Sequence, residues 1–363
     1  MINKPTLKGY EKMADIIKYL TAAVEDMASD IFIVSGLPVS YKKDGASKPA
    51  DTTMVMPNLA NELVQDLYEL AKRPIDRFLD SGDDDFSISL PGLSRFRIST
   101  YRQRGSMAAV IRVVNFEIPD YQSMSIPEGI IDISKKTRGM VLVTGPAGGG
   151  KSTTLACVID HINATRNAHI ITLEDPIEYL HRNKMGIVSQ REIGTDTESY
   201  LTALRASLRQ APNVILLGEM RDFETIRVAT TAAETGHLVI STLHTVGAVN
   251  SIDRIIDTFP ANQQPQIRVQ LSMVLQSVVS QQLVPTVDGS LTPAFEIMHL
   301  NSSIRNLIRE SKIHQIDFVI QSSAAEGMIG MDTSLFNLYK AGRITKETAI
   351  KHASNAEQLE RKL

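Results

Sequence analysis

Near the start of the chain, the apolar residues follow first the spacing of a helix and then that of short strands. Between residues 11 and 27 they recur at steps of three and four positions, which predicts an amphipathic helix. Two short strands are expected around Gly36 and Pro38. Helical spacing returns after Pro57, so this part of the chain is predicted to contain both kinds of element.

Alternation of apolar and polar residues dominates residues 83–114. It runs in three stretches separated by turns at Gly92 and Gly105, which predicts an antiparallel meander. We therefore expect residues 1–116 to form a small α+β domain. Residues 117–137 contain two prolines and no clear periodicity, so we expect them to be an interdomain linker.

The pattern changes after residue 138. Short, uninterrupted apolar runs, such as MVLVTG, VILLGE and HLVISTLHT, alternate with helical segments. Strands without alternation are buried on both faces, as in a mainly parallel sheet covered by helices. We expect an α/β core over residues 138–285, followed by a helical C-terminal region over residues 286–363.

The amino-acid composition limits the classes of protein to which the chain can belong. The chain has 363 residues, of which 43% are hydrophobic and 22% charged, as is typical of a soluble protein with more than one domain. A net charge of -3 argues against a dedicated nucleic-acid binder. The single cysteine, Cys157, excludes an intramolecular disulfide and a four-cysteine zinc site.

The sequence carries no sign of export or of a membrane span. The N-terminal stretch lacks the apolar centre of a signal peptide, and no stretch reaches the roughly 18 apolar residues of a membrane helix. We expect a cytoplasmic protein that does not insert into the membrane and meets it only through a partner.

A glycine-rich stretch follows the first apolar run of the core. It fits the pattern G-x-x-x-x-G-K-[ST] between a predicted strand and a predicted helix, the context in which backbone N–H groups converge on phosphates. We expect it to bind ATP, with Lys151 on the β- and γ-phosphates and Ser152 on Mg²⁺. The candidate nucleotide-binding residues are Gly145, Pro146, Ala147, Gly148, Gly149, Gly150, Lys151, Ser152 and Thr153.

Many phosphate-loop enzymes hold Mg²⁺ with an aspartate at the end of a second apolar strand, and this chain lacks an aspartate at that position. In NVILLGEMRD, Gly218 stands at the position of that aspartate, and Glu219 follows. Glu174, Asp175 and Glu178 cluster after another predicted strand, and acids this close suggest a Mg²⁺-phosphate site. Solvated loop acids that cap a helix are the alternative.

Two histidines flank the predicted strand in HLVISTLHT. His244 lies at its C-terminal end, the edge at which open α/β sheets bind ligands, and His237 lies at its start. Taken singly, each would more often be a structural histidine with a hydrogen bond.

Arginines alternate with apolar residues in SRFRIST. Arg95 and Arg97 share one face of the predicted strand, while Phe96 and Ile98 share the other. A guanidinium that reaches a γ-phosphate can neutralise charge in the transition state. A solvated strand face, or ion pairs with the acids of residues 83–85, would explain the same pattern.

Several of these stretches together resemble one family. They are GPAGGGKSTTLA, ITLEDPIEYLH, LRQAPNVILLGEMRDFETIRVATTAAETGHLVISTLHT and DRIIDTFP, which resemble the secretion ATPases of type IV pili and type II secretion. Within that superfamily, SSIRNLIRESKIHQI and MDTSLFNLYKAGRIT are similar to the pilus retraction ATPases. The resemblance covers nearly the whole chain and is strong from Phe86 onward.

The resemblance implies a RecA-like phosphate-loop core, a smaller α+β PAS-like N-terminal domain and a homohexameric ring. Such a ring hydrolyses ATP at the cytoplasmic face of the inner membrane and withdraws pilin subunits, which drives twitching motility. The implied partners are an inner-membrane platform protein of the pilus and, as a further candidate, a paralogous retraction ATPase.

The resemblance also implies roles for single residues. Glu178 falls in the family's "Asp box", Glu219 matches its catalytic glutamate, and His237 and His244 form its "His box". The family presents arginines to the nucleotide from the stretch that corresponds to SRFRISTYRQRGSMAAVIRVV, which here supplies Arg97 and Arg112 first, then Arg95 and Arg104.

The chain departs from the family pattern at three positions. Ala147 and Gly149 stand where the usual loop has Thr and Ser, but backbone cradling needs neither side chain. Ser303 replaces the alanine that begins the retraction-associated motif, which leaves the coupling to retraction open.

Functions other than that of a retraction motor were also considered for this sequence. An accessory paralogue of the retraction ATPases fits nearly as well. Pilus-assembly and type II secretion ATPases usually carry a tetracysteine zinc module, which one cysteine cannot build. The acidic balance disfavours a nucleic-acid-dependent RecA-like motor. The presence of Lys151, Ser152 and Glu219 disfavours a pseudoenzyme that only binds nucleotide.

Overall fold

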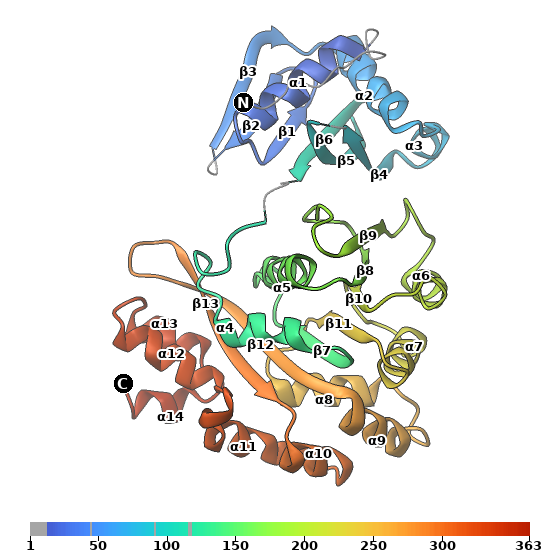
Figure 1. The fold of residues 1–363 in the computed structure, drawn as a ribbon. Helices are drawn as coiled ribbons and strands as arrows, with labels where there is room; N and C mark the ends of the chain where they lie inside the picture. Colours follow the sequence, from blue (N-terminus) through green and yellow to red (C-terminus); the bar gives the residue numbers. More distant parts are fainter. Residues whose placement is uncertain (1–12, 44–45, 91, 115–117) are drawn as a thin grey trace. The chain divides into compact units, whose positions relative to one another are not determined.

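A computed structural model describes residues 13–43, 46–90, 92–114 and 118–363. The first twelve residues, which bear on the expectation of no export signal, lie outside this part of the chain. The chain divides into two compact units (Figure 1), which are Met1–Glu117 with Glu178–Leu180, and Ile118–Ile177 with His181–Leu363.

A six-stranded antiparallel sheet forms the centre of the first unit, with the order β3-β2-β1-β6-β5-β4. Residues 83–114 form three consecutive paired strands of it, which confirms the predicted meander. The strands are β1 (Asp30–Ile33), β2 (Pro38–Lys43), β3 (Ala46–Met54), β4 (Asp83–Leu90), β5 (Ser94–Gln103) and β6 (Ser106–Val114).

The described residues of this unit also form the helices α1 (Ala14–Glu25), α2 (Pro57–Ala71) and α3 (Asp76–Ser81). Their apolar side chains share a core with the inward face of the sheet, where Phe96 and Ile98 are fully buried. Pro57 is the first residue of α2, where its fixed φ suits a helix start. The two longer helices are those that the periodicity predicts.

β3 is a strand that the hydrophobic pattern does not predict. It lies at the edge of the sheet, and none of its residues is buried. Edge strands of this kind carry polar and charged side chains, which discourage pairing with other chains. Because neither face of β3 is covered, its residues show no alternation.

A seven-stranded sheet forms the second unit, with the order β13-β12-β7-β11-β10-β8-β9. Strands β12 through β9 in this order are parallel, and β13 pairs with β12 in the antiparallel sense. The strands are β7 (Gly139–Thr144), β8 (His169–Glu174), β9 (Ile187–Glu192), β10 (Val214–Leu217), β11 (Leu238–Leu243), β12 (Leu275–Pro285) and β13 (Leu291–His299).

Both faces of this sheet are buried. In β7, Met140 and Leu142 enter one apolar core, while Val141 and Val143 enter another on the opposite face. The helices are α4 (Glu128–Ile131), α5 (Lys151–Thr165), α6 (Tyr200–Ser207), α7 (Phe223–Glu234), α8 (Ala248–Asp257), α9 (Gln264–Val274), α10 (Ser302–Arg309), α11 (Ile316–Ser322), α12 (Met331–Lys340), α13 (Lys346–His352) and α14 (Ala356–Glu360). This arrangement is the α/β core that the uninterrupted apolar runs predict.

Two segments differ from the sequence-based expectation. Within the expected linker, residues 128–135 form α4 and a 3-10 helix (Asp132–Lys135), and the isoleucines between positions 126 and 133 are buried in the core of the second unit. The run is too short to show periodicity. The sheet also continues past residue 285, because β13 pairs with β12 along its whole length. The helical region therefore begins with α10.

Candidate nucleotide-binding site

The glycine-rich loop connects the end of β7 to the start of α5. Gly145, Gly148 and Gly150 have φ angles of 139°, 72° and 82°, values that favour glycine because a Cβ would be strained there. The loop leads into the N-terminus of α5, where backbone N–H groups and the helix dipole attract phosphate.

Gln281 of β12 supports this loop from behind. A Cβ at Gly145 would lie 2.0 Å from the Gln281 carbonyl oxygen, and one at Gly150 would lie 2.7 Å from its Nε2. The Gln281 side chain also accepts a hydrogen bond of 2.7 Å from Oγ1 of Thr154 in α5. A Cβ at Gly148, in contrast, would meet no atom within 4 Å, so this side of the loop is open to a phosphate.

Lys151 is buried at the start of α5. Its Nζ donates hydrogen bonds to the carbonyl oxygens of Gly145 (2.9 Å) and Pro146 (2.8 Å). The ammonium is therefore held inside the curve of the loop, where it can meet the charge of a bound phosphate.

The residues after Lys151 fit a nucleotide with its metal. Ser152 and Thr153 are half-buried in the first turn of α5. Over the described part of the chain, no three His, Cys, Asp or Glu side chains gather as a metal site. Mg²⁺ bound with a nucleotide takes most of its ligands from phosphate and water, so Ser152 would be its protein ligand here.

Glu219 and His244 meet at the same edge of the sheet. They follow β10 and β11, which are adjacent and parallel. The Glu219 side chain is only 16% exposed, and its Oε2 lies 2.7 Å from Nε of Arg221 and 3.4 Å from Nε2 of His244. The structure thus brings two of the predicted catalytic residues together, next to the edge at which β7 enters the phosphate loop.

His237 does not reach this edge within its own chain. It precedes β11, whereas His244 follows it, so the strand separates them by about 20 Å at roughly 3.3 Å per residue. The Nδ1 of His237 lies 3.0 Å from the carbonyl oxygen of Ala232 in α7, a local contact at the N-terminal edge of the sheet.

The acids after β8 occupy different environments. Glu174 accepts hydrogen bonds from Thr172 (2.6 Å) and Gln190 (3.2 Å), while Asp175 and Glu178 are exposed. No helix begins in residues 175–186, all of which the structure describes, so these acids do not cap one. Glu174 ends the strand next to β10 and lies at the phosphate edge.

Tyr200 explains the glycine that stands at the usual aspartate position. A Cβ at Gly218 would lie 2.7 Å from the Tyr200 hydroxyl and 3.2 Å from the Leu173 carbonyl oxygen. Burial raises the pKa of Tyr200, and the nearby Glu219, Asp175 and Glu174 raise it further, so the hydroxyl stays protonated. Gly218 and Tyr200 are therefore matched in space, although they are distant in sequence.

The arginines of the first unit share one face of its sheet. Arg97 stands directly opposite Arg112 in the β5–β6 pair, and Arg95 lies two residues from Arg97 on the same face. Arg112 contacts Asp30 at 3.1 Å, and Arg95 donates to Ser89 at 3.1 Å. Arg104 is exposed in the β5–β6 turn.

Ion pairs between these arginines and the acids of residues 83–85 were the alternative explanation, but Asp84 pairs with another arginine. That buried carboxylate is held by Arg73, whose Nε lies 2.9 Å from Oδ2. The shared face of Arg95, Arg97 and Arg112 thus agrees with the alternation in the sequence.

Sequence reasoning missed three residues that shape the site. Arg221 lies two residues after Glu219 in the sequence, but no motif assigned it a function. Tyr200 and Gln281 gave no sequence signal, because their partners lie on other elements.

No helix in the described part of the chain has the length and hydrophobicity needed to cross a membrane.

Known proteins resemble the chain along nearly its full length. Residues 9–340 match the family described as type II/IV secretion system protein. The type IV pilus retraction ATPase PilT of Pseudomonas aeruginosa is 41% identical over 92% of this chain and 97% of its own length. The type IV pilus ATPase PilU of the same organism is 39% identical over 94% of this chain and 89% of its own.

A solved structure agrees with these likenesses. The crystal structure of the pilus retraction motor PilT with bound ADP has a TM-score of 0.87 and 43% sequence identity, covering 96% of this chain and 98% of that one. With its RecA-like core and phosphate loop, the chain belongs to the ATPases of the type II/IV secretion system protein family.

Proposed function

We propose that the protein is a hexameric ATPase motor that hydrolyses ATP to drive pilus retraction, and with it twitching motility. The contact between Glu219 and His244, beside the strand that enters the phosphate loop, carries the part of the proposal that concerns ATP hydrolysis. The likeness to the retraction ATPase PilT over nearly the full length of both chains supports it.

In this proposal, residues 145–153 hold the phosphates of ATP, and Ser152 holds Mg²⁺. Lys151 neutralises phosphate charge, and Glu219 orients the attacking water with His244 beside it. Glu178, which is exposed, is retained as a candidate catalytic residue on the likeness to the family. His237 would act on a neighbouring subunit, because within its own chain it lies far from the phosphate edge.

The ring is proposed because the candidate arginines belong to a different unit of the chain. Arg97 and Arg112 project from one face of the β5–β6 pair and would reach nucleotide bound by an adjacent subunit. Hydrolysis would change the docking of rigid units, and the ring would pass this movement to an inner-membrane platform protein of the pilus.

An accessory motor is the second candidate, because the likeness to PilU is almost as high as that to PilT. The two differ in what they do alone. A bacterium that lacks both retraction ATPases should regain twitching with this protein by itself if it is the main motor. It should regain twitching only together with the other ATPase if it is the accessory one.

The first experiment measures ATP turnover against mass in solution for the wild type and for Arg97→Ala/Arg112→Ala. Turnover confined to a hexamer, and lost in the variant while the hexamer persists, is expected. A control removes two exposed charges from the same unit, Lys48→Ala/Lys72→Ala, and should retain turnover. Equal turnover by a monomer would overturn the ring mechanism.

A further inference from the structure

The helices α8 and α12 are among those of the second unit that begin without a side-chain cap. α8 follows Gly247 and α12 follows Gly330, and neither glycine has a side chain that could accept a hydrogen bond from the N–H groups of the helix start. Such groups need partners when they are not in water.

At α8, Glu296 of β13 is that partner. Its Oε1 accepts a hydrogen bond of 2.7 Å from the backbone N–H of Ala248, the first residue of α8. Burial raises the pKa of Glu296, and the bond from Ala248 opposes this rise. Glu296 is only 6% exposed, so a buried side chain from the sheet caps the N-terminus of α8.

The sheet places Glu296 between these helices. Ile297 forms an isolated antiparallel bridge with Ile329, which brings the chain before α12 to β13. On the other side, Ser280 stands opposite Glu296 in the β12–β13 pair, and its hydroxyl accepts from the Gly247 N–H at 2.8 Å. Two cross-strand neighbours therefore hold two consecutive N–H groups at the start of α8.

The start of α8 is connected to His244 by only three residues, and side chains of the helix hold them. Asn250 donates to the carbonyl oxygen of Val246 at 2.8 Å, and the hydroxyls of Ser251 and Thr245 lie 2.7 Å apart. The position of His244 therefore depends on the position of the α8 N-terminus.

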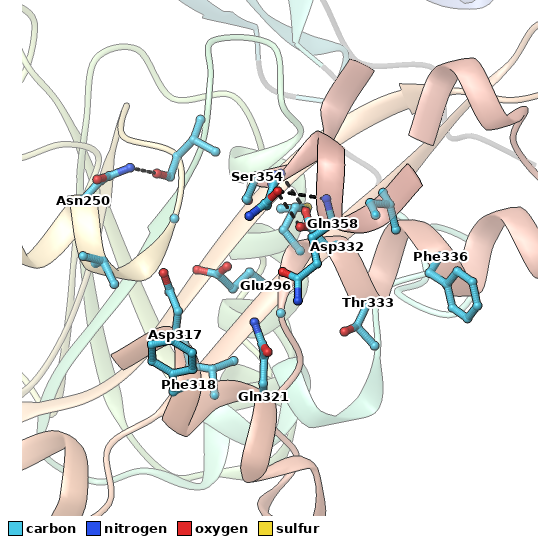
Figure 2. Close-up of a pocket in the computed structure, with 18 of the residues that line it drawn as sticks. Asn250, Glu296, Asp317, Phe318, Gln321, Asp332, Thr333, Phe336, Ser354 and Gln358 are labelled. Carbon is cyan, nitrogen blue, oxygen red and sulfur yellow. Dashed lines mark hydrogen bonds between the residues drawn. The ribbon is translucent and has the colours of Figure 1, made fainter. Parts of the chain in front are cut away.

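The carboxylate borders a cavity of about 740 Å³ between α8, α11, α12 and the C-terminal end of the chain. Figure 2 shows Glu296 between Asn250 of α8 and Asp332 of α12, with Asp317 also on the cavity wall. Asp332 is engaged elsewhere, since it accepts from the backbone N–H groups of Ser354 (2.6 Å) and Asn355 (3.0 Å). Glu296 is thus the acid on this cavity that holds the start of α8.

We propose that Glu296 is a positioning residue for ATP hydrolysis, which holds His244 beside Glu219 by capping α8 from β13. The next residue of that strand, Ile297, pairs with Ile329 just before α12, so the same strand connects α8 to the C-terminal region. The part that concerns hydrolysis rests on the proposed function, whereas the capping itself does not. Glu296 does not touch the phosphate loop, so its effect should fall on turnover and leave nucleotide binding unchanged.

The capping is tested by amide hydrogen exchange on the full chain without nucleotide. In Glu296→Ala, peptides that cover residues 245–251 should exchange about tenfold faster or more, as expected when a helix cap is lost. Glu296→Gln keeps an acceptor oxygen and should restore much of the protection. The control Asp317→Asn changes an exposed acid on the same cavity and should exchange like the wild type. Unchanged exchange in both Glu296 variants would overturn the proposal, whatever their activity.

The positioning role is tested by steady-state kinetics on the same variants. Glu296→Ala should lower kcat at least about tenfold with KM and ADP affinity within roughly twofold of wild type, and Glu296→Gln should recover part of the loss. A fall in ADP affinity that matches the fall in kcat would mean general loosening and would refute the positioning role. If the wild type itself does not hydrolyse ATP, the proposed function fails, while the exchange result still decides the capping.

Discussion

His244 and Glu219 meet at one oxygen atom, with Nε2 of the histidine 3.4 Å from Oε2 of the glutamate. The same oxygen lies 2.7 Å from Nε of Arg221, so two cationic or potentially cationic groups orient a carboxylate that is mostly buried. This geometry suits a residue that must keep one orientation while it directs a water molecule.

Glu219→Gln should abolish most of the turnover without affecting nucleotide binding. The amide has the same shape but is a poorer proton acceptor, so kcat should fall by roughly 10³-fold, within the range for loss of general-base assistance. Turnover and fluorescent-nucleotide affinity measure the two effects. Glu224→Gln, which removes a more exposed acid paired with Arg205 and Arg227, is the matched control. A near-normal kcat in Glu219→Gln would move the role to the acids of residues 174–178.

His244→Ala and His237→Ala should behave differently. Loss of His244 removes a contact with the Glu219 carboxylate, so we expect turnover to fall roughly tenfold, in line with one hydrogen bond to a charged group. His237 lies at the other end of β11 and can act only from another subunit. Mixing inactive Glu219→Gln subunits with His237→Ala subunits checks this, because partial recovery of turnover would place the two residues in one shared site.

Gly218→Ala should destabilise the second unit, and Tyr200→Phe should rescue it. The added methyl would lie 2.7 Å from the Tyr200 hydroxyl, so we expect a loss of about 1–3 kcal/mol in the free energy of unfolding. Removal of the hydroxyl leaves the Leu173 carbonyl oxygen, at 3.2 Å, as the nearest contact. Denaturant unfolding of the single and double variants gives the coupling free energy, and its absence would show that the hydroxyl is not the obstacle.

The stability of the protein should fall in mild acid because of His181. Burial lowers the pKa of His181 to about 4, and its Nδ1 has no hydrogen-bond partner in the described part of the chain. Below about pH 6.5, the ordinary pKa of histidine, His181 becomes protonated in the unfolded state but stays neutral in the folded state. The free energy of unfolding therefore decreases as the pH falls from about 6.5 to about 4.

The loss attributable to this group is about 3 kcal/mol at most over that range. His181→Gln should therefore show a smaller drop in unfolding free energy between pH 7 and pH 4.5 than the wild type. His314→Gln, at an exposed histidine, should follow the wild type. Parallel curves for wild type and His181→Gln would contradict the prediction.

The phosphate loop and most of the regular elements are readable from local sequence. A glycine-rich loop between an apolar run and a helix needs only neighbouring residues to take its shape, and Gly145, Gly148 and Gly150 adopt the angles that this pattern implies. Uninterrupted apolar runs likewise predict the strands that are buried on both faces. The order of those elements along the chain is enough to place Glu219 and His244 at the ends of two strands.

The sequence did not predict which strands stand side by side or what covers them. β3 was not predicted because neither of its faces is buried, so its residues show no alternation. β13 was not predicted because the sequence after residue 285 was interpreted as helical. The short helices within the expected linker were not predicted either, because the buried isoleucines span too few turns to show a helical period.

Local sequence is enough to predict the candidate chemistry of this protein, because a phosphate loop, a glutamate after a strand and a histidine after the next strand are each local patterns. The residues that support this chemistry become evident only in the folded chain. Gln281 lies behind the loop from 127 residues away, and Glu296 caps a helix that begins 48 residues earlier. Contacts of this kind depend on the order of strands in the sheet, and no periodicity along the chain encodes that order.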